Sequence, residues 1–394
     1  MPQTRENVIG IVELTDEYDA SDQRAAEAFN GLRDAFFTRL QGWVRAKDEC
    51  RKMNHNRVCV VLRDIGGEGE LLLAASKLQR LFKEPHHHLG ANLHFSVRAG
   101  FSLFSSANDD VNLAMRQAGI ALNQARYSPQ LYEVYSPQRT RNLHAETALL
   151  HKMEDALENG EFQLYYQPQM HAGYNTLLGA EALLRWHTRD NEVLTPAAFI
   201  DVAEKNDIIK PITWWVIKSA VARLARWPEA LGIAVNVPPS LLLQDDIQSV
   251  VHDALDIYGV TPSRLNLEVT ERIMVDNQDF MLRQLHALRD VGVKISIDDF
   301  GTGFSSLSYF RDLPVDEIKI DQSFVRAMLR SEKDHAIVKA VIDLAHNFSL
   351  KVVAEGVETR ETAERLTQMR CDILQGYVFD RPMPVEAFER QYRL

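Results

Sequence analysis

The sequence predicts an α/β protein in which a (β/α)₈ barrel of the TIM type follows an α+β domain. A chain of 394 residues is too long for one ordinary core, because domains cluster near roughly 100–150 residues and only barrels commonly reach about 250. After residue 145 apolar strand candidates alternate with helical patterns, and most of these strands end in acidic or amide side chains. We therefore expect two domains, at residues 1–138 and 145–394.

The first domain is predicted to alternate strands and helices. Strand candidates rich in Val, Ile, Phe and Tyr are 7–14, 57–64, 95–104 and 130–136. Helical patterns cover 22–44, 68–82 and 111–126. In the longest of them, Leu32, Phe36, Leu40 and Trp43 recur at intervals of three and four, so one stripe should face a sheet. The junction with the second domain is expected near Pro137.

The second domain repeats strands and helices in the manner of a barrel. Its eight strand candidates are 165–169, 178–186, 232–237, 265–271, 294–300, 317–321, 351–357 and 373–379. Helical patterns fall between most successive strands, at 212–227, 246–258, 280–291, 334–348 and 361–370. Barrels of this type place their chemistry at the C-terminal ends of the strands.

Composition excludes several classes of protein. A formal net charge of −11 opposes binding to a phosphate backbone, so we expect no bulk nucleic-acid binding. The three cysteines have no paired spacing, which argues against a disulfide framework or a zinc knuckle. No stretch approaches about 18 consecutive apolar residues, and the first residues do not resemble a signal peptide. We expect a cytoplasmic protein without a membrane segment.

Polar side chains recur at the strand ends of the second domain. They are Glu181, Asn236, Glu268, Glu271, Asp298, Asp299, Lys319, Asp321, Glu355, Glu358 and Gln375. Several lie two residues apart, as Ser296 and Asp298 do, and so share one face of a strand. That face should point into the mouth of the barrel.

Glu181, Glu268, Asp298, Asp299 and Glu355 would crowd five carboxylates into one pocket. At about 5 Å and an effective dielectric near 20, each like-charge pair costs roughly 3 kcal/mol, so either cations or protons must compensate them. An all-oxygen ligand set favours Mg²⁺ or Mn²⁺, and two such ions suit displacement at phosphorus. The reaction class predicted from the residues is metal-assisted hydrolysis of a phosphodiester or a phosphomonoester.

Each of these residues also has a purely structural interpretation. A single acid that closes a strand is commonly a helix N-cap or a solvated end. Lys319 would, on spacing alone, equally well form a salt bridge inside the barrel. The two glycines and three hydroxyls in residues 299–306 fit either a tight turn or a mobile loop over the site.

From residue 145 onward the chain resembles the EAL-domain family of cyclic di-GMP phosphodiesterases. The naming signature stands as Glu181-Ala182-Leu183. The other matching motifs are YQP from Tyr166, NVP from Asn236, LEVTE from Leu267, IDDFG from Ile297, IKID from Ile318, AEGVE from Ala354 and QGY from Gln375. The resemblance implies a barrel with one reversed strand. It also implies hydrolysis of cyclic di-GMP to linear pGpG in bacterial second-messenger signalling.

The resemblance also implies two Mg²⁺ or Mn²⁺ ions in each active site. The implied metal ligands are Glu181, Asn236, Glu268, Asp298, Asp299 and Glu355. Lys319 would orient the attacking water and stabilise developing negative charge, and Glu271 would anchor the 299–306 loop. Glu358 and Gln375 would support metal-bound water and substrate. Gln167, Leu183, Arg185 and Gln375 would contact the dinucleotide.

The first domain is similar to the GGDEF diguanylate-cyclase fold in its strand order. Residues 54–58, Asn-His-Asn-Arg-Val, replace the naming motif and lack its glycines and acids, so we expect a domain without cyclase activity. Arg45 and Asp48 retain the spacing of that family's inhibitory RxxD site, although an exposed i,i+3 charge pair has the same pattern.

Three functions remain to be separated. The first is an enzyme that opens cyclic di-GMP, and the second is a receptor or scaffold that binds it without hydrolysis. A purely structural role fits poorly with the complete set of acids. We also expect a homodimer and a protein partner through the first domain.

Overall fold

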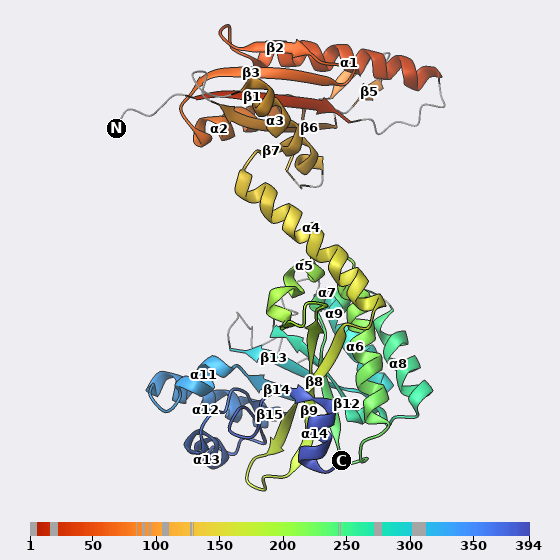
Figure 1. Ribbon diagram of the computed structural model, residues 1–394, viewed down its shortest axis with the longest axis vertical. Coiled ribbons are helices and arrows are strands. Elements are labelled where there is room, and N and C mark those ends of the chain that lie inside the picture. The colour runs from red at the N-terminus through yellow and green to blue at the C-terminus, as the bar shows by residue number, and fades with distance from the viewer. Residues whose placement is uncertain are drawn as a thin grey trace. The chain divides into compact units, whose positions relative to one another are not determined.

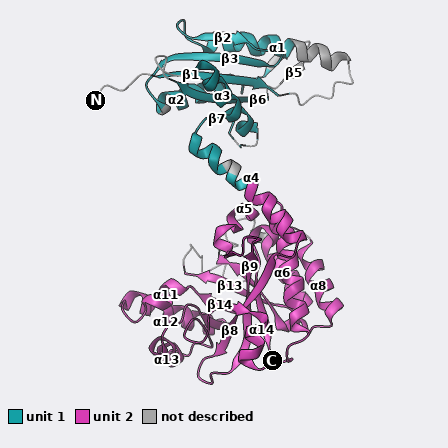
Figure 2. Ribbon diagram, viewed as in Figure 1, with its two compact units in different colours: residues 1–146 teal, residues 147–394 magenta. Residues whose placement is uncertain are grey.

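The computed structural model describes residues 6–15, 23–83, 85–88, 91–93, 96–104, 110–126, 128, 130–242, 244, 246–271, 278–301 and 313–394. The chain forms two compact units, Met1–Glu146 and Thr147–Leu394 (Figure 2). Each unit has its own apolar core. In the part that the structure describes, no helix is both long and apolar enough to cross a membrane.

The first unit is built on a five-stranded mixed sheet, with the order β2-β3-β1-β6-β7. Its strands are β1 (Glu6–Leu14), β2 (Glu49–Lys52), β3 (Arg57–Ile65), β6 (Val97–Phe104) and β7 (Tyr132–Val134), and its helices are α1 (Gln23–Trp43), α2 (Glu68–Leu81) and α3 (Val111–Arg126). The central strand β1 is apolar on both faces. Val8 and Val12 pack with α1 and α2, whereas Ile9 and Ile11 pack with α3. The unit is therefore a sheet between two helical layers (Figure 1).

Some elements of this unit differ from the sequence prediction. The strand β2 was not predicted, although it forms an antiparallel pair with β3. The short ribbon of β4 (His86–His88) and β5 (Ala91–Leu93) was also not predicted. These segments are short and carry little apolar periodicity, so their pairing depends on a neighbouring strand. Residue 95, the predicted start of the third strand, lies outside the described residues.

The helix α4 (Pro137–Glu158) begins where the sequence indicated a junction. Proline fits the first position of a helix, because its fixed φ suits the helix and its missing N–H would have no helical partner there. The division between the units falls inside this helix, between Glu146 and Thr147.

The predicted eight-stranded barrel is confirmed in the second unit. Its strands are β8 (Phe162–His171), β9 (Leu177–His187), β11 (Gly232–Asn236), β12 (Leu265–Thr270), β13 (Lys294–Phe300), β14 (Glu317–Ile320), β15 (Lys351–Ala354) and β16 (Ile373–Gln375). They follow one another around the sheet, and the pairing of β8 with β9 and β16 closes it. The short strands β10 (Val193–Leu194) and β17 (Met383–Pro384) pair antiparallel with β9 and β8, respectively.

One strand of the barrel, β8, runs against its neighbours. It is antiparallel to both β9 and β16, whereas the other neighbouring strands of the barrel are parallel. A turn in which Gly173 and Asn175 adopt positive φ joins β8 to β9. Such a connection can form only a hairpin, because a parallel pair needs a crossover of a dozen or more residues. The family resemblance implied this reversal, which we did not infer from the spacing of the predicted strands.

Helices surround the barrel and bury the outer face of its strands (Figure 1). They are α5 (Ile200–Glu204), α6 (Ile209–Leu224), α7 (Pro239–Leu242), α8 (Ile247–Tyr258), α9 (Gln278–Val291), α11 (Gln322–Ala327), α12 (Glu332–Asn347), α13 (Arg360–Gln368) and α14 (Val385–Tyr392). In β13 and β14, Ile295, Ile297, Ile318 and Ile320 belong to the apolar core. The alternate residues are polar, so strand geometry turns them into the barrel.

Candidate functional site

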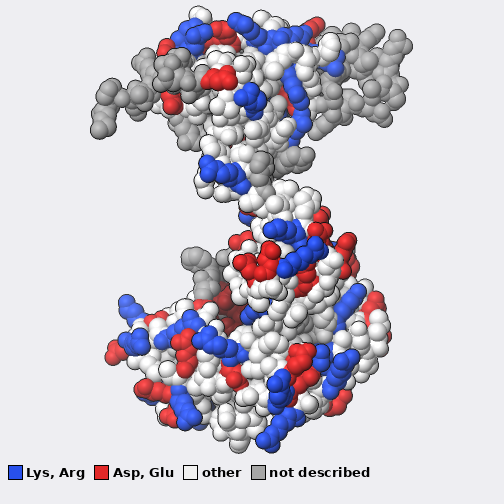
Figure 3. Space-filling view, viewed as in Figure 1, with Lys and Arg blue, Asp and Glu red and all other residues white. Residues whose placement is uncertain are grey.

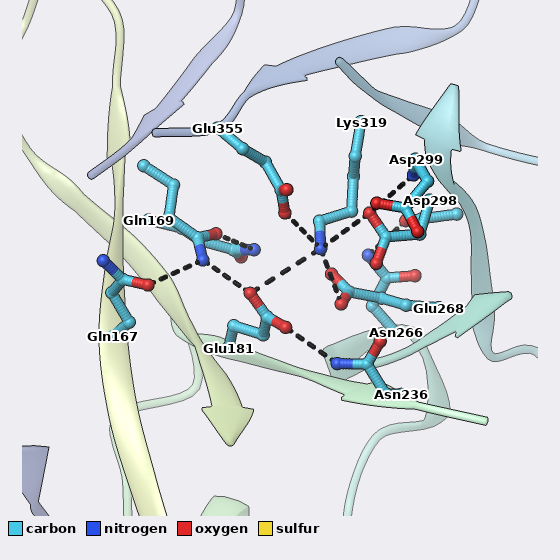
Figure 4. Close-up of polar contacts among 12 residues, drawn as sticks. Gln167, Gln169, Glu181, Asn236, Asn266, Glu268, Asp298, Asp299, Lys319 and Glu355 are labelled. Carbon is cyan, nitrogen blue, oxygen red and sulfur yellow. Dashed lines mark hydrogen bonds and ion pairs between the residues drawn. The ribbon is translucent and has the colours of Figure 1, made fainter. Parts of the chain in front are cut away.

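The inward side chains of five neighbouring strands converge at the barrel mouth. Figure 4 shows Glu181 of β9, Asn236 of β11, Glu268 of β12, Asp298 of β13 and Lys319 of β14 around one point. The parallel register of the strands determines the level at which each side chain enters the barrel. Asn236, for example, pairs with Glu268 across β11 and β12. The sequence placed these residues at strand ends, and the barrel brings them together.

Lys319 lies at the centre of this cluster with no exposed surface. Its Nζ lies 2.6 Å from Oε1 of Glu355, 2.8 Å from Oε2 of Glu268, 3.3 Å from Oδ1 of Asp298 and 3.6 Å from Oε2 of Glu181. The salt-bridge interpretation of Lys319 therefore matches its contacts. One ammonium is shared among four carboxylates, so the cluster keeps an excess of negative charge if all four are ionised.

Burial and mutual repulsion perturb the titration of these groups. Burial raises the pKa of Glu355 to about 8, because desolvation and the charges of Asp298 and Glu181 outweigh the attraction of Lys319. Burial and the Glu181 carboxylate raise the pKa of Glu268 well above its usual value. Burial also opposes the charge of Lys319, but the surrounding carboxylates raise its pKa well above the usual range.

Glu181 differs from its neighbours because amide groups solvate it. Burial favours its neutral form, but Lys319 and the hydrogen bonds from Gln375 and Asn236 outweigh this effect and lower its pKa. Gln375 donates from Nε2 to Oε2 of Glu181 at 2.5 Å, and Asn236 donates from Nδ2 to Oε1 at 2.7 Å. Both carboxylate oxygens of Glu181 thus accept a hydrogen bond.

A further amide, Gln169 of β8, belongs to the same network but was not identified in the sequence. Its Nε2 donates to Oε1 of Gln375 at 3.1 Å, and Gln375 also donates to Oε1 of Gln167 at 3.2 Å (Figure 4). The available sequence signal was the two-residue spacing from Gln167, which places both side chains on one face of the strand.

The end of β13 and the start of its following loop are tied to β12. The N–H of Gly301 donates to Oε2 of Glu271 at 3.0 Å, and Gly301 adopts a φ of +100° that favours glycine. Asp299 is exposed and also has a positive φ of +55°. Residues 302–306 of the predicted mobile loop lie outside the described residues.

The remaining expected site residues border one cavity of about 260 Å³ at the barrel mouth. Its lining includes Gln167, Glu181, Leu183, Arg185, Asp298, Glu355, Glu358, Gln375 and Tyr377. Arg185 stacks over the ring of Tyr165 at 5.5 Å, and burial lowers the pKa of its guanidinium. Glu358 forms an ion pair with Arg326 of α11 at 2.9 Å. Arg326 also lines the cavity, and the sequence did not indicate it.

The donor set of the cluster suits a hard cation. Oε1 of Glu268 is buried without a hydrogen-bond partner, and the cluster around it consists of carboxylates and amides together with the Lys319 ammonium. Among the described residues, however, no three or more His, Cys, Asp or Glu side chains already stand in a metal-binding arrangement. The carboxylates are instead oriented toward Lys319 (Figure 4). The residues fit a divalent cation chemically, because carboxylate and amide oxygens are the ligands that such a cation prefers.

Arg45 and Asp48 belong to the first unit and bond to each other. The side chain of Asp48 is only 1% exposed, and it accepts hydrogen bonds from Nε and the backbone N–H of Arg45 and from the N–H of Arg63. Nη2 of Arg45 donates to the carbonyl oxygen of Arg63. The pair therefore fastens the segment after α1 to β3.

Comparison with known proteins identifies the family of the second unit. A model of the EAL domain matches residues 151–382. The chain is 34% identical over 379 residues to an uncharacterized signaling protein of Caulobacter vibrioides, covering 95% of this chain and 47% of that protein. It is also 34% identical over 363 residues to the cyclic di-GMP phosphodiesterase NbdA of Pseudomonas aeruginosa, covering 90% of this chain and 46% of that protein.

A solved structure shows the same similarity. The PaMucR phosphodiesterase in complex with c-di-GMP superposes with a TM-score of 0.60 at 40% identity, covering 61% of this chain and 99% of that chain. The chain spans about half the length of the curated relatives it matches. The chain belongs to the EAL domain family, the family of the cyclic di-GMP phosphodiesterases to which it is similar.

Proposed function

We propose that the barrel hydrolyses one phosphodiester bond of cyclic di-GMP and releases linear pGpG. The observation that carries this proposal is the convergence of four carboxylates on Lys319, beside a cavity that also presents Arg185, Gln167 and Gln375. The similarity to NbdA and to the PaMucR complex supports the choice of substrate. The mixed charges on the face in Figure 3, where basic side chains are interspersed with acidic ones, fit a small ligand better than a long nucleic acid.

The reaction requires divalent cations, for which we propose two Mg²⁺ or Mn²⁺ ions. The residues proposed to hold them are Glu181, Asn236, Glu268, Asp298, Asp299 and Glu355. When bound, the ions would lower the pKa of a water molecule and polarise the phosphodiester group. Oε1 of Glu268 supports this proposal, because it is a buried carboxylate oxygen without a hydrogen-bond partner and a cation could bind it.

Other side chains would orient the reacting groups. Lys319 would stabilise negative charge at the phosphate oxygens as the transition state forms, because it is a buried cation that ion pairs hold in place. Glu271 would hold the loop after β13 through Gly301. Arg185 would pair with a phosphate through its planar guanidinium, and Gln167 and Leu183 would contact the bases. Glu358 and Gln375 would complete the polar wall of the cavity.

We further propose that the first unit is a degenerate GGDEF-like domain without cyclase activity. Residues 54–58 lie where β2 turns into β3, and Oδ1 of Asn54 accepts hydrogen bonds from the N–H groups of Asn56 and Arg57. This closed turn provides neither the glycines nor the acids that bind a nucleotide and metal. We assign the unit to dimerisation or partner binding, and the whole protein to the cytoplasm.

One observation favours a second candidate, a receptor that binds cyclic di-GMP without cleaving it. Lys319 already neutralises part of the carboxylate cluster, so the site is partly charge-compensated without a metal ion. In a receptor this arrangement would persist when the ligand binds.

The test is incubation of the purified chain with cyclic di-GMP and Mg²⁺ or Mn²⁺, with products resolved by chromatography. The enzyme proposal expects linear pGpG from the parent protein, and a strong loss of product from Glu181→Ala, which removes a proposed metal ligand. Binding of cyclic di-GMP without any linear product, at all metal concentrations tried, would establish the receptor instead.

A further inference from the structure

The reversed strand β8 places two glutamines next to site residues of both neighbouring strands, β9 and β16. Gln167 and Gln169 are two residues apart, so they share the inner face of β8. Across one edge Gln167 pairs in register with Glu181 of β9, and across the other Gln169 pairs with Gln375 of β16. The antiparallel strand therefore links the acid of β9 to the amide of β16.

The hydrogen bonds in this network have a defined direction. Oε2 of Glu181 can only accept while ionised, so the group of Gln375 that faces it must be the NH₂. The carbonyl Oε1 of Gln375 then points to Nε2 of Gln169, which donates to it. All three side chains are buried, so water is a poor substitute for either bond.

We propose that Gln169 is a positioning residue that fixes the amide orientation of Gln375, and through it the carboxylate of Glu181. The proposal rests on the function proposed above, in which Glu181 binds a metal ion. With the opposite amide orientation, Gln375 would present its carbonyl oxygen to the carboxylate and to Oε1 of Gln167, and both contacts would repel. Gln169 opposes that rotation, because its NH₂ donates a hydrogen bond to the carbonyl oxygen of Gln375 in the observed orientation.

The experiment exchanges the donor at residue 169. Gln169→Glu replaces the NH₂ of residue 169 by an acceptor. This acceptor attracts the NH₂ of Gln375, so the amide of Gln375 rotates and its carbonyl oxygen faces Glu181. Gln169→Met removes the donor without adding charge. Groups that orient a metal ligand typically change metal affinity or activity by about 10–100-fold, so we expect that loss in Gln169→Glu and a smaller loss in Gln169→Met.

Two readouts besides turnover separate positioning from general damage. The first is Mn²⁺ affinity, measured from the electron paramagnetic resonance signal of free Mn²⁺. The second is the thermal unfolding midpoint in EDTA, which requires neither metal nor substrate. Gln391→Glu makes the same amide-to-acid change at an exposed residue in the last helix and serves as the matched control.

A double variant isolates the amide orientation from the added charge. In a Gln375→Met background no amide remains to rotate, so Gln169→Glu should cause a clearly smaller further change in Mn²⁺ affinity and in unfolding midpoint than it does in the parent. Equal effects of Gln169→Glu in both backgrounds would overturn the proposal, as would a Gln169→Glu variant that behaves like the Gln391→Glu control. A parent protein that yields no linear product would refute the proposed function alone, because the midpoints in EDTA still measure the coupling between residues 169 and 375.

Discussion

Glu271 accepts a hydrogen bond from the backbone N–H of Gly301 at 3.0 Å, which joins the end of β12 to the loop after β13. Glu271→Ala removes this acceptor, whereas Glu271→Gln keeps a carbonyl oxygen that can occupy its place. We expect a loss of turnover of about 10–100-fold for the alanine variant and a smaller loss for the glutamine variant, as for other groups that orient an active site. Steady-state kinetics with cyclic di-GMP would measure both, and equal losses would show that the charge of Glu271 acts in another way.

Lys319→Ala should separate chemistry from binding. A preorganised cation that meets charge in the transition state is worth on the order of 10²–10³ in turnover, and its loss should leave the affinity for cyclic di-GMP nearly unchanged. Calorimetry and a turnover assay on the same preparation would test this. A large loss of affinity would instead show that Lys319 holds the ground-state ligand.

The thermal stability of the Lys319→Ala variant should depend on divalent cations. Without Lys319 the carboxylates of Glu268 and Glu355 lose their nearest cation, and an uncompensated buried charge is strongly destabilising. We expect the unfolding midpoint of Lys319→Ala to fall in EDTA and to recover with Mg²⁺ more than the midpoint of the parent does. A midpoint that does not change with Mg²⁺ would argue against cation binding at this cluster.

Calcium should inhibit hydrolysis. Ca²⁺ prefers six to eight oxygen ligands at about 2.3–2.6 Å, so it can occupy an all-oxygen site and yet displace the reacting groups. We expect cyclic di-GMP to bind in Ca²⁺ while turnover stays far below that in Mg²⁺ or Mn²⁺. Equal turnover in Ca²⁺ and Mg²⁺ would contradict the proposed metal chemistry.

The first unit should not convert GTP to cyclic di-GMP. The turn at residues 54–58 has no acid or glycine in its sequence, and the side chain of Asn54 closes it. The measurement is incubation of the full chain carrying Glu181→Ala with GTP and Mg²⁺, so that any cyclic product accumulates. Steady formation of that product would disprove the assignment of the unit as degenerate.

Asp48 should make the stability of the first unit depend on pH. Burial would raise the pKa of Asp48, but the hydrogen bonds from Arg45 and Arg63 outweigh it and lower this pKa in the folded state. The contribution to stability is thus present above the unfolded pKa of about 3.9 and is lost as the pH falls through the lower folded pKa.

We expect Asp48→Asn to weaken hydrogen-exchange protection of β3 near neutral pH. Exchange rates corrected for the intrinsic rate at each pH would measure the difference, and the parent and the variant should converge as the pH falls through the lowered folded pKa of Asp48. A difference that stays constant with pH would show that the charge of Asp48 does not stabilise the fold.

Much of the barrel could be predicted from the sequence because each strand carries its own pattern. Apolar residues alternate with polar ones, so segments such as 294–300 and 317–321 indicate both a strand and the face that points inward. Glu181, Glu268 and Asp298 were identified for the same reason. In the first unit, the short strand β2 was not predicted because its pairing with β3 depends on a partner outside its own sequence.

The sequence by itself determined the eight strands of the barrel and which of their side chains are polar, and it predicted that a hard cation suits those side chains. The tertiary structure decided which of them touch: that Lys319 is fully buried among four carboxylates, that Glu358 pairs with Arg326, and that Gln169 reaches Gln375. Strand patterns are local, whereas these contacts depend on which strands become neighbours and in what register when the barrel closes. The reversed strand β8 shows the difference, because its direction and its register together set Gln169 beside Gln375 and Gln167 beside Glu181.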